Sequence, residues 1–386
     1  MTSRERLLTV LNGGIPDCVP VSPDTSNMIP AKLTGKPFWD IYLYNDPPIW
    51  KAYIDCVKHF GFDSLMDGYV DIETQIDGVW YNNYGAVDER WRQVIVDRSD
   101  QRIVTQYVHD DGGGAVTWQP VVTVYGRDNP PIYNVSPETL GLPPIPSHYE
   151  EVTGVKPYPR GEELLRLVKE EMGDHGLVGV FCGTSCLISN ESEIYGYYDY
   201  PERYRAKRDQ LLELYEKRFR ALMAFECRPD FICTGCSGSL IFQTPAIFDE
   251  LALPIIQRVT ELCREYGIPS HIHSCGPEAY LVKTCAERTA LTVIDPLEIP
   301  PMGDCNLAAL KKAYGDRLVL KGNLHTTNTM LMGSPADVAA AARQAIDEAA
   351  AGGRFILSTG DQCGRDTPEE NIRAMIETAR TYGRYA

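Results

Sequence analysis

Short apolar runs alternate with longer segments of helical periodicity through most of the chain, and this alternation constrains the fold more than any other feature. The apolar runs have the length of buried strands, and helical segments follow several of them. The expected strands are residues 18–22, 63–66, 177–181, 230–234, 270–273, 291–295, 317–321 and 354–358. The expected helices include residues 201–226, 245–266, 278–288, 307–314, 334–350 and 367–382. Eight strands mostly separated by helices predict an α/β fold, a (β/α)8 TIM barrel, with a doubly wound sheet as the alternative.

The alternation is interrupted after the second expected strand. Residues 92–96, 102–108 and 115–120 are strand-like, and the sequence Asp110-Asp111-Gly112-Gly113-Gly114 is typical of a turn. We therefore expect an antiparallel β insertion at about residues 86–125. The proline-rich residues 126–160 are expected to form an irregular connection packed on the barrel. The whole chain, residues 1–386, is predicted to be a single TIM-barrel domain.

Composition excludes several classes of function. The formal net charge of −16 argues against a nucleic-acid partner, because phosphate binding needs clustered Lys and Arg. No apolar stretch reaches the roughly 18 residues of a spanning helix, so we expect no membrane contact. The N-terminus lacks the pattern of a secretory signal, and Thr2 with Glu5 predicts a capping box that opens a helix. Twelve cysteines without such a signal favour a reducing compartment, the cytoplasm.

The ends of the fifth and eighth expected strands carry potential metal ligands. Residues 270–273 run into His273-Ser274-Cys275-Gly276, and Cys363 follows residues 354–358. Residues i and i+2 of an extended segment point to the same side, and strand ends meet at one face of a barrel. One imidazole and two thiols would leave zinc an open fourth position, as catalytic sites do. The alternative is a chance spacing in which both cysteines are small buried apolar residues.

The environment of Cys363 and two competing motifs also bear on this site. Thr367 and Glu370 are typical of a capping box, and a thiol near that helix N-terminus would have a lowered pKa. His271 shares the phase of His273 and is an alternative ligand, although a hydrogen-bonded barrel residue is the simpler interpretation. The motif Cys233-Thr234-Gly235-Cys236 has the spacing of half a zinc site, but no second such motif follows, which favours packing.

Three further polar residues lie at expected strand ends. Asp24, Glu298 and His325 are candidates for substrate contact or proton transfer, and each is equally consistent with a polar rim residue. His325 is also a possible addition to the zinc site. Tyrosines crowd residues 195–200 and would suit a pocket for an aromatic substrate, although most tyrosines are packing residues.

Three stretches together resemble the uroporphyrinogen decarboxylase superfamily, in particular its cobalamin-dependent methyltransferase branch. They are residues 269–276, residues 294–298 with Gly322-Asn323-Leu324-His325, and residues 356–372. The resemblance covers about the last 160 residues well. It implies a TIM barrel and implies that His273, Cys275 and Cys363 bind zinc. True decarboxylases hold a tetrapyrrole polycarboxylate with arginines after the first strand, whereas this chain has none between Arg6 and Arg90.

The resemblance implies an enzyme: a zinc-dependent methyltransferase that moves a methyl group between a small methylated substrate and a corrinoid. The sequence shows no recognisable cobalamin-binding motif, so the corrinoid is expected on a partner protein. We favour an O-methyl donor such as a methoxylated aromatic. The first alternative is a methylcobalamin:thiol methyltransferase, because a ligand set of two thiolates and one imidazole makes zinc a weak Lewis acid. A metal-free lyase of the decarboxylase type and a non-catalytic zinc protein are less favoured.

Overall fold

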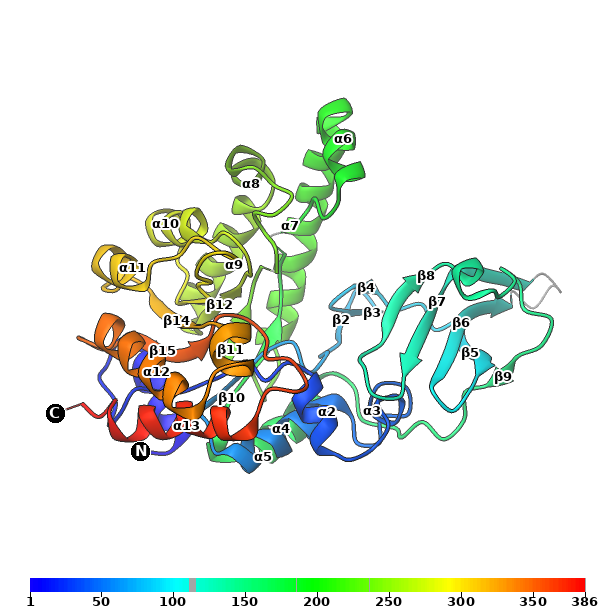
Figure 1. Cartoon of the computed structure of the whole chain (residues 1–386). Helices are drawn as coiled ribbons and strands as arrows, with labels where there is room; N and C mark the ends of the chain where they lie inside the picture. The colour runs from blue at the N-terminus through cyan, green and yellow to red at the C-terminus, as the bar shows by residue number, and fades with distance from the viewer. Residues whose placement is uncertain (111–115, 185, 236, 386) are drawn as a thin grey trace.

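Seven parallel strands form a curled sheet at the centre of the computed structural model, which describes residues 1–110, 116–184, 186–235 and 237–385 (Figure 1). Their order in the sheet is β1-β10-β11-β12-β13-β14-β15. The bounds are β1 Ser64–Met66, β10 Gly176–Phe181, β11 Phe231–Cys233, β12 Ser270–His273, β13 Val293–Asp295, β14 Val319–Leu324 and β15 Phe355–Thr359. Each strand lies on one of the apolar runs, so the prediction of a parallel α/β fold is confirmed.

Residues 18–22 join the two edges of this sheet, although they form isolated bridges and not a regular strand. On one side, Ser22 donates its backbone N–H to the carbonyl of Leu357 in β15 at 2.8 Å. On the other side, Asp63 donates its backbone N–H to the carbonyl of Val21, also at 2.8 Å. The first expected strand therefore lies between β15 and β1, as a TIM-barrel-like arrangement requires.

Helices cover the outer face of the curled sheet (Figure 1). Those flanking it are α4 Ile49–Phe60, α5 Gly161–Met172, α7 Pro201–Met223, α8 Pro245–Leu251, α9 Leu253–Tyr266, α10 Ala279–Arg288, α11 Leu307–Tyr314, α12 Pro335–Ala349 and α13 Glu369–Thr381. Helix α1 Ser3–Leu11 instead packs against strand side chains such as Leu177 and Phe231, which alternate with those that face the other helices. The shorter elements are α2 Met28–Leu33, α3 Phe38–Tyr42, α6 Glu191–Asp199, the turns η1 Pro137–Leu140 and η2 Gly173–His175, and the π-helical turn η3 Thr326–Leu331. The helix expected at 245–266 is divided into α8 and α9 at Ala252.

Apolar helix faces and the outward side chains of the strands form one large core. In α9, for example, Leu253, Ile256 and Val259 recur at helical spacing and are buried in that core. The capping box expected from Thr2 and Glu5 opens α1. Among the described residues, no helix is both long enough and apolar enough to cross a bilayer.

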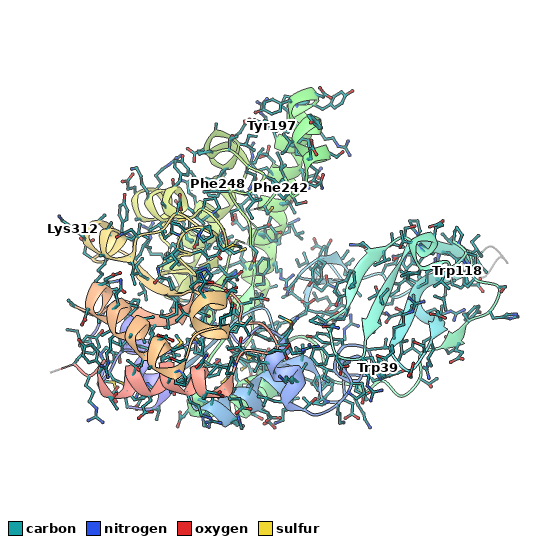
Figure 2. The ribbon with its side chains drawn as sticks, viewed as in Figure 1. Trp39, Trp118, Tyr197, Phe242, Phe248 and Lys312 are labelled. Atoms are coloured by element: carbon teal, nitrogen blue, oxygen red, sulfur yellow. The ribbon has the colours of Figure 1, made fainter. Side chains whose placement is uncertain are left out.

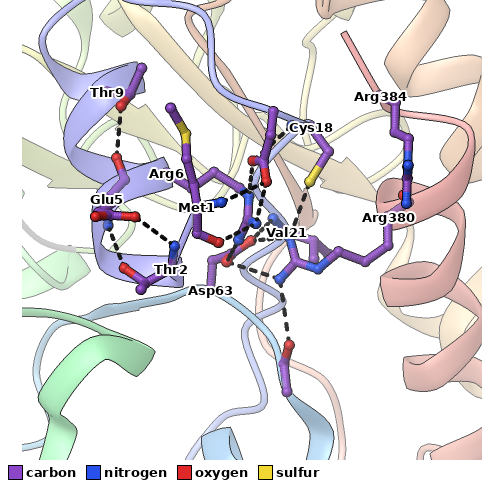
Figure 3. A network of polar contacts seen from close by, with 12 residues as sticks. Met1, Thr2, Glu5, Arg6, Thr9, Cys18, Val21, Asp63, Arg380 and Arg384 are labelled. Carbon is purple, nitrogen blue, oxygen red and sulfur yellow. Dashed lines mark hydrogen bonds and ion pairs between the residues drawn. The ribbon is translucent and has the colours of Figure 1, made fainter.

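Asp63 fixes the junction between the two ends of the chain (Figure 3). Its carboxylate is fully buried and accepts hydrogen bonds from Arg6 of α1 at 2.7 Å and from the backbone N–H of Val21 at 2.9 Å. Arg380 of α13 donates to both carboxylate oxygens, at 2.8 and 2.9 Å. The first helix, the segment that joins the sheet edges and the last helix thus share one buried anion.

A second, antiparallel sheet stands beside the curled sheet, in the order β8-β7-β6-β5-β9 (Figure 1). Its strands are β5 Trp91–Arg98, β6 Arg102–Asp110, β7 Val116–Gly126, β8 Ile132–Val135 and β9 Glu150–Glu151. Three short strands precede it: β2 Thr74–Ile76, β3 Val79–Asn82 and β4 Gly85–Ala86. β8 and β9 show that the proline-rich segment is not wholly irregular, because two parts of it pair with this sheet. Residues 111–114 of the expected turn lie outside the described residues.

An apolar cluster joins this sheet to the rest of the chain. Leu43, Ile95, Ile103 and Tyr125 are buried together, and Trp39 of α3 packs against them (Figure 2). The antiparallel sheet is therefore anchored by α3 and the residues after it, upstream of β1.

Candidate metal centre

The carboxyl ends of the parallel strands gather polar side chains at one end of the sheet. His273 is the last residue of β12, Asp295 the last of β13, and Asp361 follows β15. The register of the two neighbouring strands places His273 opposite Asp295. Asp24 follows the segment that joins the sheet edges, so its carboxylate reaches the same end. These positions match the face on which TIM-barrel enzymes carry their active sites.

His273 has one ring nitrogen engaged and one that lacks a hydrogen bond. Nδ1 lies 3.3 Å from Oδ1 of Asp295, whereas Nε2 lies 3.5 Å from Oδ1 of Asp361. Nε2 is buried and makes no hydrogen bond within the described residues. Burial opposes a charge on the ring, but Asp295 outweighs that effect and raises the pKa of His273 well above its ordinary value. A buried polar atom without a partner is uncommon and marks Nε2 as a position for a missing group.

The two predicted thiol ligands differ in exposure. Cys275 is partly exposed, whereas Cys363 is fully buried. Burial raises the pKa of Cys275, and it raises the pKa of Cys363 to about 12. The lowered pKa expected for Cys363 is therefore wrong in the metal-free protein. Helix α13 begins only at Glu369, and Pro368 caps it without a side-chain hydrogen bond, so the expected capping box does not form and burial dominates.

Asp361 lies between the predicted ligands. One group of donors consists of Asp24, His273 and Asp361, and another consists of Cys275, Glu298 and Asp361; within each group the donor atoms lie within 4.8 Å of one another. Cys363 belongs to neither group, but its backbone N–H donates to the carbonyl of Asp24 at 2.9 Å. In the described structure, His273 and Cys275 are thus linked through Asp361, and the three predicted ligands do not meet as a trio.

Asp361 is not among the site residues predicted from the sequence. Its φ is +99°, a conformation that residues other than glycine rarely adopt, and it places the carboxylate between two donor groups. The only sequence signal was its position just after an expected strand.

The donor set fits zinc. One imidazole and two thiols are ligands that zinc takes in proteins, and the unpartnered Nε2 of His273 is the lone pair that such an ion would use. The raised thiol pKa values are no obstacle, because a coordinated thiol is deprotonated by the ion itself.

His271, the alternative ligand, has both ring nitrogens engaged. Nε2 lies 2.8 Å from Oδ1 of Asp295, and Nδ1 lies 3.1 Å from Oδ2 of Asp67. Cys233 is buried beside it, with its sulfur 3.8 Å from Nδ1, and His271, Cys233 and Asp67 form a third donor group. Cys236 lies outside the described residues. His271 therefore belongs to a buried charged cluster beneath His273.

The candidates for substrate contact occupy different positions. Burial raises the pKa of Asp24 to about 6. Glu298 accepts a hydrogen bond from the backbone N–H of Gly276 at 2.5 Å, and burial raises its pKa. His325 accepts hydrogen bonds at Nδ1 from the backbone N–H groups of the second and third residues after it, at 3.1 and 3.2 Å, and so caps η3. Glu298 and His325 line one small cavity, which adjoins a larger cavity of about 390 Å³ beside His325.

The tyrosines of residues 195–200 do not line these cavities. Helix α6 stands out from the barrel and buries none of its residues (Figure 1). Tyr195, Tyr198 and Tyr200 are at least 60% exposed. Tyr197, labelled in Figure 2, is hydrogen-bonded to Glu250. These side chains form a surface and not the wall of a pocket.

The amino-acid sequence and the fold of this chain were compared with those of known proteins. Residues 230–382, from β11 to α13, match the family described as uroporphyrinogen decarboxylase (URO-D). The predicted resemblance to this superfamily, and to its corrinoid methyltransferase branch, is confirmed by this match together with the relatives below.

Two of the relatives are methylcobamide:CoM methyltransferases MtbA, from Methanosarcina mazei and Methanosarcina acetivorans. They are 24% and 23% identical to this chain over 137 residues. A uroporphyrinogen decarboxylase from Anaeromyxobacter dehalogenans is 30% identical over 141 residues. Each match covers 35% of this chain and only 36–37% of the relative. The chain therefore aligns with a little over a third of the length of these curated relatives.

One solved structure extends the likeness to the whole chain. A methyltransferase from Methanosarcina mazei superposes with a TM-score of 0.59 and covers 99% of both chains at 16% sequence identity. At that identity the superposition shows a shared fold.

Proposed function

We propose that this protein is a zinc-dependent methyltransferase that moves a methyl group between a small methylated substrate and a corrinoid carried by a partner protein. The observation that carries the proposal is the buried Nε2 of His273, which lacks a hydrogen bond within the described residues; His273 shares a donor group with Asp24 and with Asp361, which also belongs to the group of Cys275. His273, Cys275 and Cys363 would hold the metal. The names of the MtbA relatives, which state methyl transfer from a methylcobamide, support the reaction class.

Zinc bound to these residues would supply Lewis acidity toward the heteroatom of a methyl donor, or hold a substrate thiol as a thiolate. The remaining chemistry belongs to the side chains around it. Removal of a methyl group from an ether leaves an alkoxide or phenolate that needs a proton. His325 would provide one: Nδ1 accepts two backbone N–H groups, so the proton of the neutral ring would lie on Nε2, which is 3.4 Å from the side-chain nitrogen of Asn328. Glu298 lines the same cavity and would contact the substrate.

The favoured substrate is an O-methyl donor, such as a methoxylated aromatic compound. A second candidate is a methylcorrinoid:thiol methyltransferase, which the MtbA relatives favour because their names give CoM, a thiol, as the acceptor. Decarboxylation is less well supported, although one relative is a uroporphyrinogen decarboxylase. The chain has no arginine between Arg6 and Arg90, the region in which decarboxylases would hold a polycarboxylate.

We further propose that residues 1–386 act as one TIM-barrel domain. In that proposal the antiparallel strands, about residues 86–125, are an insertion after the second barrel strand, and residues 126–160 connect it back to the barrel. The apolar cluster shared by α3 and the antiparallel sheet supports it.

The decisive experiment is anaerobic. The protein is mixed with cobalt(I) cobalamin and a panel of O-, N- and S-methyl donors, and methylcobalt(III) is followed by its visible spectrum. The reverse reaction is followed with methylcobalamin and a panel of thiols. Turnover with a methyl ether supports the favoured substrate, and turnover only with thiols supports the second candidate. No turnover in either direction would rule out the methyltransferase proposal.

Zinc content tests the ligand set independently of turnover. About one zinc per chain is expected in the wild-type protein, and Cys363→Ser should lower that value. Cys285→Ser is the matched control, because Cys285 is also a buried thiol but lies within helix α10 and not after the end of a strand. Equal zinc in wild type and Cys363→Ser would show that the ligand set is wrong.

A further inference from the structure

A line of buried charged side chains lies directly beneath His273. The carboxylate of Asp295 contacts the ammonium of Lys321 through Oδ2, and through Oδ1 it contacts Nε2 of His271 at 2.8 Å and Nδ1 of His273 at 3.3 Å. Side-chain exposure is only 1% for His271 and Asp295 and 6% for Lys321. Three neighbouring strands, β12, β13 and β14, supply these four residues.

Such a cluster is costly in the interior of a barrel. Each buried ion loses its hydration, and branched apolar side chains usually fill these layers. The cluster also holds a second carboxylate, Asp67, which lies 3.1 Å from Nδ1 of His271. Within this cluster, Oδ1 of Asp295 faces both histidines of β12, His271 and His273.

The contact to His273 decides which ring nitrogen is free. When the ring is neutral, as a metal ligand must be, Asp295 Oδ1 at 3.3 Å from Nδ1 favours the proton on Nδ1 and leaves the lone pair on Nε2. Nε2 is the buried nitrogen without a hydrogen bond in the described part of the chain, and it faces the donor group of Asp24 and Asp361. Lys321 and His271 in turn fix the carboxylate from two other directions.

We propose that Asp295, held in place by Lys321 and His271, is a positioning residue that presents Nε2 of His273 to the metal ion. This inference rests on the proposed function, since it takes His273 as a zinc ligand. Asp295 does not touch the metal or the substrate in this proposal. It acts only through the orientation and tautomer of the imidazole.

The test compares two carboxylates of the same cluster. Asp295→Asn removes the anion that faces His273, whereas Asp67→Asn removes the anion on the far side of His271. The zinc dissociation constant of each purified variant is measured by competition with a chromogenic chelator. Asp295→Asn should bind zinc roughly 10–100-fold more weakly, as outer-shell changes at metal sites usually do, and Asp67→Asn should bind within about threefold of wild type. Wild-type zinc affinity in Asp295→Asn would overturn the inference.

A second measurement uses the wild-type protein and therefore does not depend on whether a variant folds. The wild-type protein is labelled with ¹⁵N-histidine and loaded with zinc, and the ring nitrogens of His273 are assigned by NMR. A protonated Nδ1 and a metal-bound Nε2 are expected, and a metal-bound Nδ1 would refute the inference. A wild-type protein that binds no zinc would instead overturn the proposed function, so the two failures are distinguishable.

Discussion

Asp63 and Arg380 form a two-point ion pair in which Arg380 donates to one carboxylate oxygen at 2.8 Å and to the other at 2.9 Å. Asp63 directly precedes β1, and Arg380 lies in the last helix. Because Arg6 of the first helix donates to the same buried carboxylate, this contact ties the two ends of the chain together beside the joined sheet edges. The barrel is thus closed by polar contacts as well as by strand pairing.

Asp63→Asn should destabilise the protein by about 3 kcal/mol, since it leaves two guanidinium groups facing an uncharged amide in a buried setting. Urea unfolding at pH 7 measures the change. The control is Asp17→Asn, because Asp17 also binds Arg6, at 2.7 Å, but its side chain is 42% exposed and screened by water. A clearly smaller loss is expected there. Equal losses in the two variants would contradict a special role for the buried carboxylate.

The strand positions were predictable because the alternation of apolar runs and amphipathic helices is a strong local signal. The break between α8 and α9 was missed although the sequence signals it: Pro254 in the first turn of α9 has no backbone N–H to continue the helix from α8. The extent of the antiparallel sheet was also missed. β9 is only two residues long, Glu150–Glu151, and it exists through its pairing with β5 and not through its own sequence.

In the candidate site, His273 and Cys275 and their acidic neighbours Asp24 and Glu298 could be proposed from the sequence, but Asp295 and Asp361 could not. Asp295 lies opposite His273 only because β12 and β13 pair in that register, a fact of tertiary structure. Asp361 reaches the ligands through an unusual backbone conformation that no sequence pattern signals. The pKa of Cys363 was predicted in the wrong direction because burial, which depends on the whole fold, outweighs proximity to a helix.

Removal of zinc should abolish methyl transfer while the fold is retained. The donor groups lie at the strand ends, whereas the large apolar core and the Asp63 junction contribute their stability without a metal. Far-UV circular dichroism before and after chelation should be superimposable, with a lower melting temperature that reflects only the lost binding energy. Collapse of the helical signal on chelation would favour a structural zinc protein instead.

The ionisation of Asp230 should make the free energy of unfolding depend on pH in the acid range. Burial alone would raise the pKa of this carboxyl, but Arg4 and Lys169 outweigh it and lower the pKa. They donate to Asp230 at 2.6 and 2.8 Å. A carboxylate with a lowered folded-state pKa stabilises the protein above its unfolded-state pKa, about 3.9, and that contribution is lost as the pH falls through the folded-state value.

Asp230→Asn should therefore cost about 2 kcal/mol near pH 7, less than Asp63→Asn because Arg4 is one-third exposed. The gap between wild type and variant should narrow as the pH is lowered from about 5 to about 3 in urea-unfolding measurements. Asp366→Asn is the control, because Asp366 is 63% exposed in its pair with Arg365, and no resolvable change is expected. A gap that is independent of pH would show that the ionisation of Asp230 is unimportant.

His325 offers a test that separates capping from proton transfer. Its Nδ1 caps η3, and its other nitrogen is the proposed proton donor. His325→Asn retains a side-chain acceptor for the cap but has no proton that it can give up as an acid, whereas His325→Ala lacks both functions. If His325 is the general acid, both variants should lose roughly 100-fold in kcat with a methyl ether, at unchanged zinc content.

The loss in kcat should be smaller for ethers whose leaving group is an acidic phenol, because such a phenolate departs without a proton. A residue that only caps the turn would give a His325→Asn variant with wild-type kcat, and only His325→Ala would be destabilised, by about 1 kcal/mol.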